Sequence, residues 1–453
     1  MQPSPENELI FREAAHEKKT VMILRERLFS IIRRLGEEPE RYARKPDRDF
    51  TRKRTLTPAV LIQLIVTMDE KSIWKGLLGH FRRRIDTPSA SAFVQQRQKL
   101  LPSALEDLFH RFSDHLRPQK KFRGYRLLAV DGSSLKSGAY PADKDAYRSG
   151  TERQHGWNLF HINALFDLEN GIYTDVIVQK EHTKHESRAL REMAVRSAIT
   201  DPVIVLADRN YEAYNNLACL EKRGWKYLIR IKDHERKNAY GLKLPDEPEF
   251  DLPIRMTLGR LTPQQLRQQG IPVPEHYYRL PNSIPFDFLG TESTAFYEFS
   301  ARIVRLTLKD GRTQLLITNL DAEQFPLSAL RELYAQRWGI ETSFRELKYM
   351  VGLIHLHSRK SDLVLQEIFA AFTVFNFTQA VAWSADEGCG HSKYKRRVNF
   401  AHAVYLCCEA LRGKSAEITG LLERTLTPRR PDRFYPRPKI TGNRLSAMYV
   451  SAR

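Results

Sequence analysis

The spacing of apolar positions changes several times along the chain, and each change predicts a different kind of structure. From residue 1 to about residue 120, apolar positions recur at helical spacing and predict helices throughout. Thr57-Pro58 and Thr87-Pro88 each have the form of an N-cap followed by a first-turn proline. The second pair precedes residues 89–100, whose exposed side is predicted to carry Ser91, Gln95, Gln96 and Lys99.

From residue 125 the pattern becomes that of strands alternating with helices. Asn170-Gly171 lies between two apolar runs and predicts a hairpin turn. The order along the chain is three strands, a helix, a strand, a helix and a strand, which predicts a mixed sheet with helices on its faces. The predicted strands are 126–131, 161–168, 172–180, 202–207 and 226–232, and the predicted helices are 187–199 and 213–223.

A proline-rich segment, residues 236–295, separates this sheet from the last third of the chain. Two alternating runs follow, joined by a predicted Asp-Gly hairpin at 309–312, and together they predict a β-rich insertion. Residues 327–351 have helical spacing without proline and predict one long helix. Residues 363–382 predict an apolar core helix. A basic, proline-punctuated tail begins at about Lys393, and about its last 25 residues are expected to be disordered until bound.

The excess of basic residues indicates a polyanionic partner. Lys and Arg number 73 against 54 Asp and Glu, a net charge of +19, and nucleic acid is the most common partner of so basic a chain. A membrane surface is the rival, but the longest apolar run, 369–383, is short for a span and is interrupted by Asn376 and Gln379. The N-terminus has no apolar signal core. The four cysteines form no metal-spaced set, so we expect a cytosolic chain without structural zinc.

Five polar side chains fall on one face of the helix predicted for 327–351. A helix turns about 100° per residue, which aligns Tyr334, Arg337, Glu341, Arg345 and Lys348. One interpretation is a solvated face joined by ion pairs of Glu341 with Arg337 and Arg345. The other is that Glu341 binds a metal ion while its basic neighbours and Tyr334 hold phosphates. The choice depends on carboxylates elsewhere in the chain.

Two further carboxylates follow apolar runs of the predicted sheet. Asp131 and Asp208 are each expected at the end of a strand, where carboxylates of neighbouring strands can converge, and a helix packed on the sheet can add Glu341. Three carboxylates without Cys or His suit hard cations such as Mg²⁺, and two such ions can promote in-line displacement at phosphorus. Each aspartate taken alone is more often a turn or helix cap.

Three motifs make the chain resemble the DDE transposases of the IS-four type, the cut-and-paste enzymes of bacterial insertion sequences. Asp131-Gly132-Ser133 resembles the first-aspartate motif, and Asp208-Arg209-Asn210-Tyr211 resembles the second. Tyr334-x2-Arg337-x3-Glu341-x6-Lys348 resembles the family's Tyr-Arg-Glu-Lys signature in register. The resemblance covers roughly residues 124–382. It implies a ribonuclease-H-like core, with a mixed five-stranded sheet, interrupted by the β-rich insertion and preceded by an all-helical domain.

The resemblance also implies a function and its residues. Asp131, Asp208 and Glu341 would bind two Mg²⁺ ions, for which Mn²⁺ can substitute. The implied partners are double-stranded DNA, as the element's own terminal inverted repeats and as target, and a second copy in a synaptic dimer that passes through a hairpin intermediate. Family members stack a flipped base on an aromatic of the insertion, for which Phe296, Tyr297 and Phe299 are the candidates here. The DNA-binding residues would be Tyr334, Arg337, Lys348, Arg345 and Arg209.

Other interpretations remain open. A two-metal nuclease or resolvase would share the three acids, and a catalytically inactive DNA-binding protein would share the charge. His182-Thr183-Lys184-His185-Glu186 has neither zinc-protease order, and is read as a helix start or as a group supporting the metals. No phosphate-binding loop is present. A bacterial, cytoplasmic, nucleoid-associated protein is expected, with a helical DNA-binding domain (1–122), a catalytic core in two parts (123–235 and 313–385), an insertion (236–312) and a basic C-terminal region (386–453).

Overall fold

The computed structural model describes residues 5–428, with gaps at 53, 69–71, 117, 119, 152–154, 233–241, 243, 309–310, 388–395 and 415–417. The side chains of 5–20, 384–387, 396–397 and 419 also lie outside the description. The turn residues Lys309 and Asp310 and the end of the basic tail after residue 428 are therefore outside the described residues.

Six helices precede the sheet, and their caps follow the local sequence. Thr57 accepts a hydrogen bond from the Val60 N–H and so caps the helix that begins at Pro58, as its sequence predicts. The helix predicted to begin after Thr87 begins at Ala90 instead, and Ser89 caps it. The predicted exposure of Gln96 was wrong. Its side chain is buried because it faces the connection 47–58, with which it lines a cavity of about 330 Å³. The helices are α1 (Pro5–Gly36), α2 (Pro39–Tyr42), α3 (Pro58–Thr67), α4 (Ile73–His80), α5 (Ala90–Arg97) and α6 (Ser103–His115).

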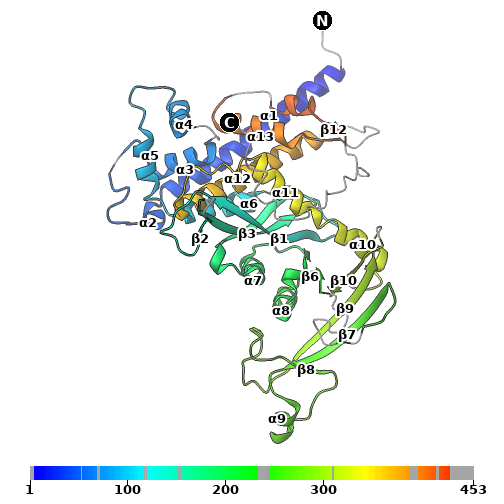
Figure 1. Ribbon diagram of the computed structural model, residues 1–453. Helices are drawn as coiled ribbons and strands as arrows, with labels where there is room; N and C mark the ends of the chain where they lie inside the picture. Colours follow the sequence, from blue (N-terminus) through cyan, green and yellow to red (C-terminus); the bar gives the residue numbers. More distant parts are fainter. Residues whose placement is uncertain are drawn as a thin grey trace.

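One mixed sheet forms the middle of the molecule, as the sequence predicts (Figure 1). Its first part has the order β4-β3-β1-β5-β6, in which β1, β5 and β6 are parallel while β3 and β4 are antiparallel to their neighbours. The short strand β2 (Tyr147–Arg148) pairs with the start of β3. The bounds are β1 (Arg126–Ser137), β3 (Trp157–Asp167), β4 (Ile172–Lys180), β5 (Val203–Ala207) and β6 (Lys226–Arg230).

Four more strands extend the sheet beyond β6. β10 (Thr313–Thr318) pairs antiparallel with β6, and β9 (Tyr297–Thr307), β7 (Phe250–Gly259) and β8 (Tyr277–Arg279) follow in that order. Figure 1 shows β7–β9 as an arm that leaves the body of the molecule and ends near α9 (Pro263–Gln268). Strands β7 and β8 of the proline-rich segment are thus part of the main sheet, which they join by pairing through β9 and β10.

The two faces of the sheet are covered by different helices. The even-numbered residues Leu128 and Val130 pack with α7 (Glu186–Arg196) and α8 (Tyr214–Lys222). The odd-numbered residues Leu127 and Ala129 pack on the opposite side, with the helices that follow β10. Alternation along a strand produces this division, and it decides on which face each polar residue of β1 lies. Two short 3₁₀ helices, η1 (Glu181–Thr183) and η2 (Arg209–Tyr211), connect these elements.

The predicted helix 327–351 is in fact two helices, so that prediction was wrong. α10 (Leu327–Ala335) has Gln336 as its C-cap, and α11 (Trp338–Tyr349) has Arg337 as its N-cap. Between them the chain tightens into i→i−3 hydrogen bonds, including Arg337 N–H to Tyr334 O at 3.1 Å. Gly339 allows this junction to approach the sheet, because a Cβ there would lie 2.6 Å from Leu168 Cδ2.

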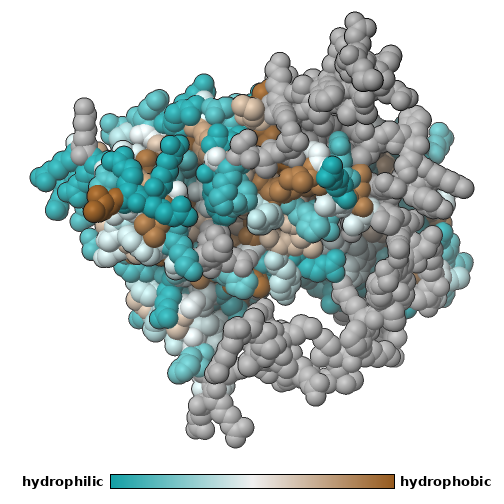
Figure 2. All heavy atoms as spheres, turned by 90° about the horizontal axis from the view of Figure 1, so that it is seen from above, coloured by the Kyte–Doolittle hydropathy of each residue, from teal (hydrophilic) through white to brown (hydrophobic). Residues whose placement is uncertain are grey.

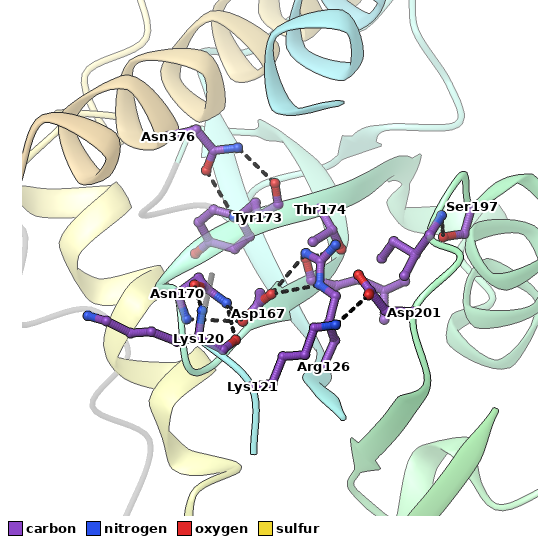
Figure 3. Close-up of polar contacts among 12 residues, drawn as sticks. Lys120, Lys121, Arg126, Asp167, Asn170, Tyr173, Thr174, Ser197, Asp201 and Asn376 are labelled. Carbon is purple, nitrogen blue, oxygen red and sulfur yellow. Dashed lines mark hydrogen bonds and ion pairs between the residues drawn. The ribbon is translucent and has the colours of Figure 1, made fainter. Parts of the chain in front are cut away.

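The long helix α12 (Ser361–Glu387) forms the core of the helical layer, as its apolar pattern predicts. Asn376 of α12 accepts a hydrogen bond from the Tyr173 N–H (2.9 Å) and donates one to the Tyr173 carbonyl (2.7 Å). Figure 3 shows Asn376 reaching from α12 to β4, close to the buried pair of Arg126 and Asp167. The amide satisfies backbone groups on the edge of β4 that no other described strand pairs, which anchors α12 to the sheet.

By length and composition, one described segment, Ser361–Trp383 of α12, could cross a membrane, but 78% of its most apolar part is buried inside the protein. Its neighbours include α6 and α13 (Phe400–Leu411). The remaining elements are α14 (Ile418–Glu423) and the paired short strands β11 (Arg396–Arg397) and β12 (Thr427–Pro428).

Candidate active site

Asp131 and Asp208 lie on neighbouring parallel strands. Val130 of β1 is in register with Ala207 of β5, so the next position on each strand carries one of the two aspartates. Neighbouring strands are about 4.8 Å apart. Asp208 follows the end of β5, as predicted, but the prediction that Asp131 ends its strand was wrong. β1 continues to Ser137 because it remains paired with β3 after β5 has ended.

Glu341 reaches the same place from the first turn of α11. Asp131 has the same parity as Leu127 and Ala129, whose face of the sheet α10 and α11 cover. Arg337 joins the two acids, with Nη2 3.1 Å from Glu341 Oε1 and Nη1 3.7 Å from Asp131 Oδ2. Burial opposes the charge of Arg337, but Tyr334 and the surrounding carboxylates, including Asp208, outweigh it and raise the pKa of the guanidinium.

Electrostatics couple the three acids. Burial, and then the negative charges of Glu341 and Asp208, raise the pKa of Asp131 from 3.8 to about 6. The Gly132 N–H, which donates to Asp131 Oδ1 at 2.8 Å, and Arg337 act in the opposite direction without cancelling this effect. Burial is the largest cause of this raised pKa, and Arg337 alone does not compensate for it. The site therefore favours the arrival of a cation.

Carboxylate oxygens of this kind suit a hard divalent cation. The buried Asp208 Oδ1 has no hydrogen-bond partner, and its nearest cation is Arg230 Nη1 at 3.8 Å. In the part of the chain that the structure describes, no three Asp, Glu, His or Cys side chains are grouped closely enough to hold an ion as they stand. The three carboxylates are thus suitable ligands for a metal ion, and their negative charge is only partly compensated. In the metal-free protein, Arg337 forms ion pairs with Asp131 and Glu341.

The other predicted site residues surround the acids at different depths. Tyr334 is buried and donates a hydrogen bond to the Ala207 carbonyl (3.3 Å), and burial raises its pKa to about 12. Lys348 Nζ donates to the Ser134 carbonyl at 2.8 Å, and burial lowers the pKa of this amine. Arg209 and Arg345 are exposed. Tyr334 and Arg337 therefore do not lie on a solvated face, although the helical wheel allowed one.

Sequence reasoning gave little weight to a second group on the opposite face of β1. His161 of β3 is buried, and its Nε2 lies 2.9 Å from Glu186 Oε1 of α7. His161, and then Asn210 of the second-aspartate segment, lower the pKa of Glu186. His185 is the exposed N-cap of α7, as predicted, whereas Glu186 is half-buried. The contacts with His161 and Asn210 place Glu186 beside both aspartate segments.

His161 and Glu186 leave no room for a side chain at residue 132, so only glycine fits there without a shift of its neighbours. A Cβ at residue 132 would lie 2.5 Å from His161 Nε2 and 3.0 Å from Glu186 Oε1. We expect Gly132→Ala to lower the free energy of unfolding by about 1–3 kcal/mol, because the buried ring must shift. Urea denaturation measures this effect. In a Gly132→Ala/His161→Ala double variant the cost should be well below the sum of the single costs, and additive costs would contradict the clash.

The aromatic residues considered for base stacking, and Trp338 beside the acids, differ in exposure. Phe299 is buried in the core between β9 and α8, so its candidacy for stacking on a base was wrong. Phe296 and Tyr297 are partly buried. Trp338, directly after Arg337, is 49% exposed, and the Arg337 guanidinium lies 5.3 Å from the centre of its ring.

Comparison with known proteins identifies the family. Residues 122–377, more than half of the chain, match the family described as "Transposase DDE domain". The chain belongs to the DDE transposase family. The predicted resemblance to IS-four-type DDE transposases is confirmed, because the chain is 25% identical over 298 residues to "Transposase InsG for insertion sequence element IS4" from Escherichia coli (strain K12). This match covers 64% of the chain and spans 60% of the length of that relative.

A solved transposase structure also aligns with the chain. The "Cryo-EM structure of piggyBac transposase synaptic complex with hairpin DNA (SNHP)" aligns with a TM-score of 0.40 at 12% identity. The alignment covers 80% of this chain and 71% of the piggyBac chain. The family match, residues 122–377, includes Asp131, Asp208 and Glu341.

Proposed function

We propose that this DDE transposase catalyses cut-and-paste transposition of its own insertion sequence. It would bind the terminal inverted repeats of the element, cleave DNA phosphodiesters there, and join the 3′ ends to target DNA. The observation that carries the proposal is the meeting of Asp131, Asp208 and Glu341 around Arg337, on three elements of a chain that belongs to this family.

Asp131, Asp208 and Glu341 would hold two divalent ions, with Mg²⁺ preferred and Mn²⁺ as a substitute. When bound, such ions lower the pKa of a water or 3′-hydroxyl and stabilise the charge of the leaving oxygen. The protein's own contribution would be to place the carboxylates on a rigid sheet and helix and to present cations beside them. Arg337 would then turn from the carboxylates to a phosphate oxygen, to which a guanidinium can donate two hydrogen bonds.

The remaining cations would hold the DNA backbone. Lys348 of α11 bonds to the Ser134 carbonyl of β1, three residues after Asp131, while the exposed Arg209 and Arg345 are accessible to phosphates without rearrangement. Tyr334 would act from within, since its hydroxyl bonds to the carbonyl directly before Asp208. The net charge of +19 supports a DNA partner. In the face shown in Figure 2, the described residues are mostly hydrophilic and the apolar ones form small, separate patches.

The wider organisation is part of the proposal. The strand order β4-β3-β1-β5-β6 supports a ribonuclease-H-like core, with residues 236–312 as an insertion and residues 1–122 as a DNA-binding domain. A homodimer would bring two element ends together in the synaptic complex. The protein would act in the bacterial cytoplasm, associated with the nucleoid.

The experiment that tests this function is excision from a plasmid carrying the gene with its native flanks. Purified protein is added with Mg²⁺, with Mn²⁺ or with EDTA, and a Glu341→Gln variant is assayed in parallel. We expect a linear fragment with defined ends only when a divalent ion is present, and binding without cleavage by the variant. A plasmid that is bound but never cut under either ion would contradict the catalytic proposal. Cleavage at unrelated sites would favour a two-metal nuclease instead.

A further inference from the structure

The turn between α4 and α5 has a conformation that its sequence does not favour. Helix α4 ends in a Schellman motif, in which Arg83 N–H bonds to Leu78 O (2.8 Å) and Arg82 N–H bonds to Gly79 O (3.3 Å). Arg82 occupies the left-handed position that is usually glycine, with φ 53°, and Arg83 repeats it with φ 57°. Two consecutive left-handed arginines are strained, and strain that persists is a reason to look for a function of the side chains.

The turn is nevertheless well braced. Arg84 makes a bidentate ion pair with Asp86 at 2.9 and 2.7 Å, and Thr87 bonds to the Arg84 carbonyl through both its N–H and its hydroxyl. These bonds fix the position of Ile85, which lies between Arg84 and Asp86 and projects into solvent. Its side chain is fully exposed, more than any other large hydrophobic residue in the described chain.

A single exposed isoleucine is ordinary, so exposure alone proves nothing. What distinguishes Ile85 is the charge beside it. Asp86 neutralises Arg84, while Arg82 and Arg83 are exposed and form no ion pair with any described residue. A bare apolar side chain on a braced turn, with two exposed cations next to it, is the combination with which proteins wedge open a base step while contacting phosphates.

The surroundings of the turn agree with a DNA partner. Helix α5 begins four residues after Asp86, and its first turns expose Ser91 and Gln95. Short polar side chains at the N-terminal end of a helix are suited to base edges. The exposed Lys75 on α4 adds to the positive charge. A protein partner would need an acidic surface with an apolar pocket, whereas a duplex offers phosphates and stacked bases at every step.

We propose that the α4–α5 turn is a DNA wedge: Ile85 inserts between base pairs from the minor groove and bends the duplex, while Arg82 and Arg83 bind the flanking phosphates. The proposal rests on the proposed function, since it assigns to this turn a part in binding the element's terminal DNA. It also explains why arginine stands where glycine would relieve the backbone.

Binding and bending of a short duplex with the element's terminal sequence test the wedge. Affinity is measured by fluorescence anisotropy over a range of salt concentrations, and bending by energy transfer between dyes at the two DNA ends. With the full chain, Ile85→Ala should weaken binding roughly tenfold and reduce the bend, without changing the slope of log K against log salt. Val195→Ala, at an exposed residue of α7, is the matched control and should change neither.

Arg82→Gly separates a role in binding from a role in structure. Glycine is favoured at a left-handed position, so this variant should raise Tm. It should also weaken DNA binding and reduce the salt slope by about one, because one phosphate contact is lost. A lower Tm together with weaker binding would show a merely structural role and overturn the proposal.

The outcomes distinguish the two proposals. If the wild type binds, bends and excises DNA while Ile85→Ala matches it in all three, the wedge is wrong and the transposase function stands. If Ile85→Ala changes the oligomeric state by light scattering but leaves DNA affinity and bending unchanged, the turn joins two copies and the wedge is wrong. If the wild type binds no duplex, both proposals fail.

Discussion

Asp131→Asn is expected to abolish cleavage and, at the same time, to stabilise the metal-free protein. The loss of activity should be on the order of 10³-fold, because a carboxylate is removed from the proposed metal site. The gain in the free energy of unfolding should be about 1–3 kcal/mol at pH 7, since the pKa of Asp131 is raised to about 6 and one pKa unit corresponds to about 1.4 kcal/mol. The Asp131 side chain is 24% exposed, so the lower part of this range is expected.

The pH dependence gives the sign of this effect. Between pH 3.8, the ordinary value, and about 6, the folded protein keeps a proton on Asp131 that the unfolded chain has lost. The wild type therefore loses stability as pH rises through this window, and above it carries the full cost of a buried charge. Asparagine does not titrate, so its advantage in urea denaturation with EDTA should be complete above about pH 6 and absent below about pH 4.

Mg²⁺ and a second aspartate provide the controls for this prediction. Added Mg²⁺ should restore stability to the wild type but not to Asp131→Asn. Asp175 is buried but already paired with Arg196 through Nε at 2.9 Å, so Asp175→Asn should destabilise the protein instead. Stabilisation by both substitutions, or by neither, would contradict the idea that Asp131 awaits a cation.

The pattern of apolar and polar residues predicted those strands and turns whose structure depends on residues close together in the sequence. Continuous apolar runs became β1 and β5 because both faces of these strands are covered, and the Asn170-Gly171 hairpin joins β3 to β4 with Gly171 at φ 66°. The three acids were singled out because each follows such a run or lies on a polar helical face. Their positions are therefore predictable from residues close to them in sequence.

What the sequence could not predict depends on contacts between distant segments. Asp131 lies inside β1 because β3 extends the ladder past β5, which no property of residues 131–137 reveals. The break between α10 and α11 coincides with the packing of Gly339 on Leu168, 171 residues earlier. The contact of Glu186 with His161 joins α7 to β3, so its relation to Gly132 becomes visible only when the sheet is formed.

Arg97→Ala is expected to lower the free energy of unfolding by about 3–5 kcal/mol, which is the usual cost of removing one partner of a buried ion pair. Arg97 ends α5 and is 1% exposed, and its Nη1 lies 2.9 Å from Glu367 Oε1 of α12. Its Nε donates to Gln366 Oε1 at 2.7 Å, and Nη2 donates to the Leu363 carbonyl at 2.6 Å. Alanine would leave a carboxylate, an amide and a carbonyl without these donors.

This effect bears on function because α12 connects two regions that the proposed reaction must coordinate. Arg97 joins α12 to α5, which follows the proposed wedge, and Asn376 joins the same helix to β4 of the catalytic sheet. Urea denaturation monitored by circular dichroism measures the cost, and Arg188→Ala, which removes an exposed i,i+4 pair with Glu192, should change stability by less than about 0.5 kcal/mol. Without Arg97, Glu367 keeps hydrogen bonds from the His357 N–H and the Ser358 hydroxyl but loses its cation, so Arg97→Met/Glu367→Met should recover much of the loss. A cost below about 1 kcal/mol for Arg97→Ala would mean that water reaches Glu367 and that α5 is not held to α12 by this pair.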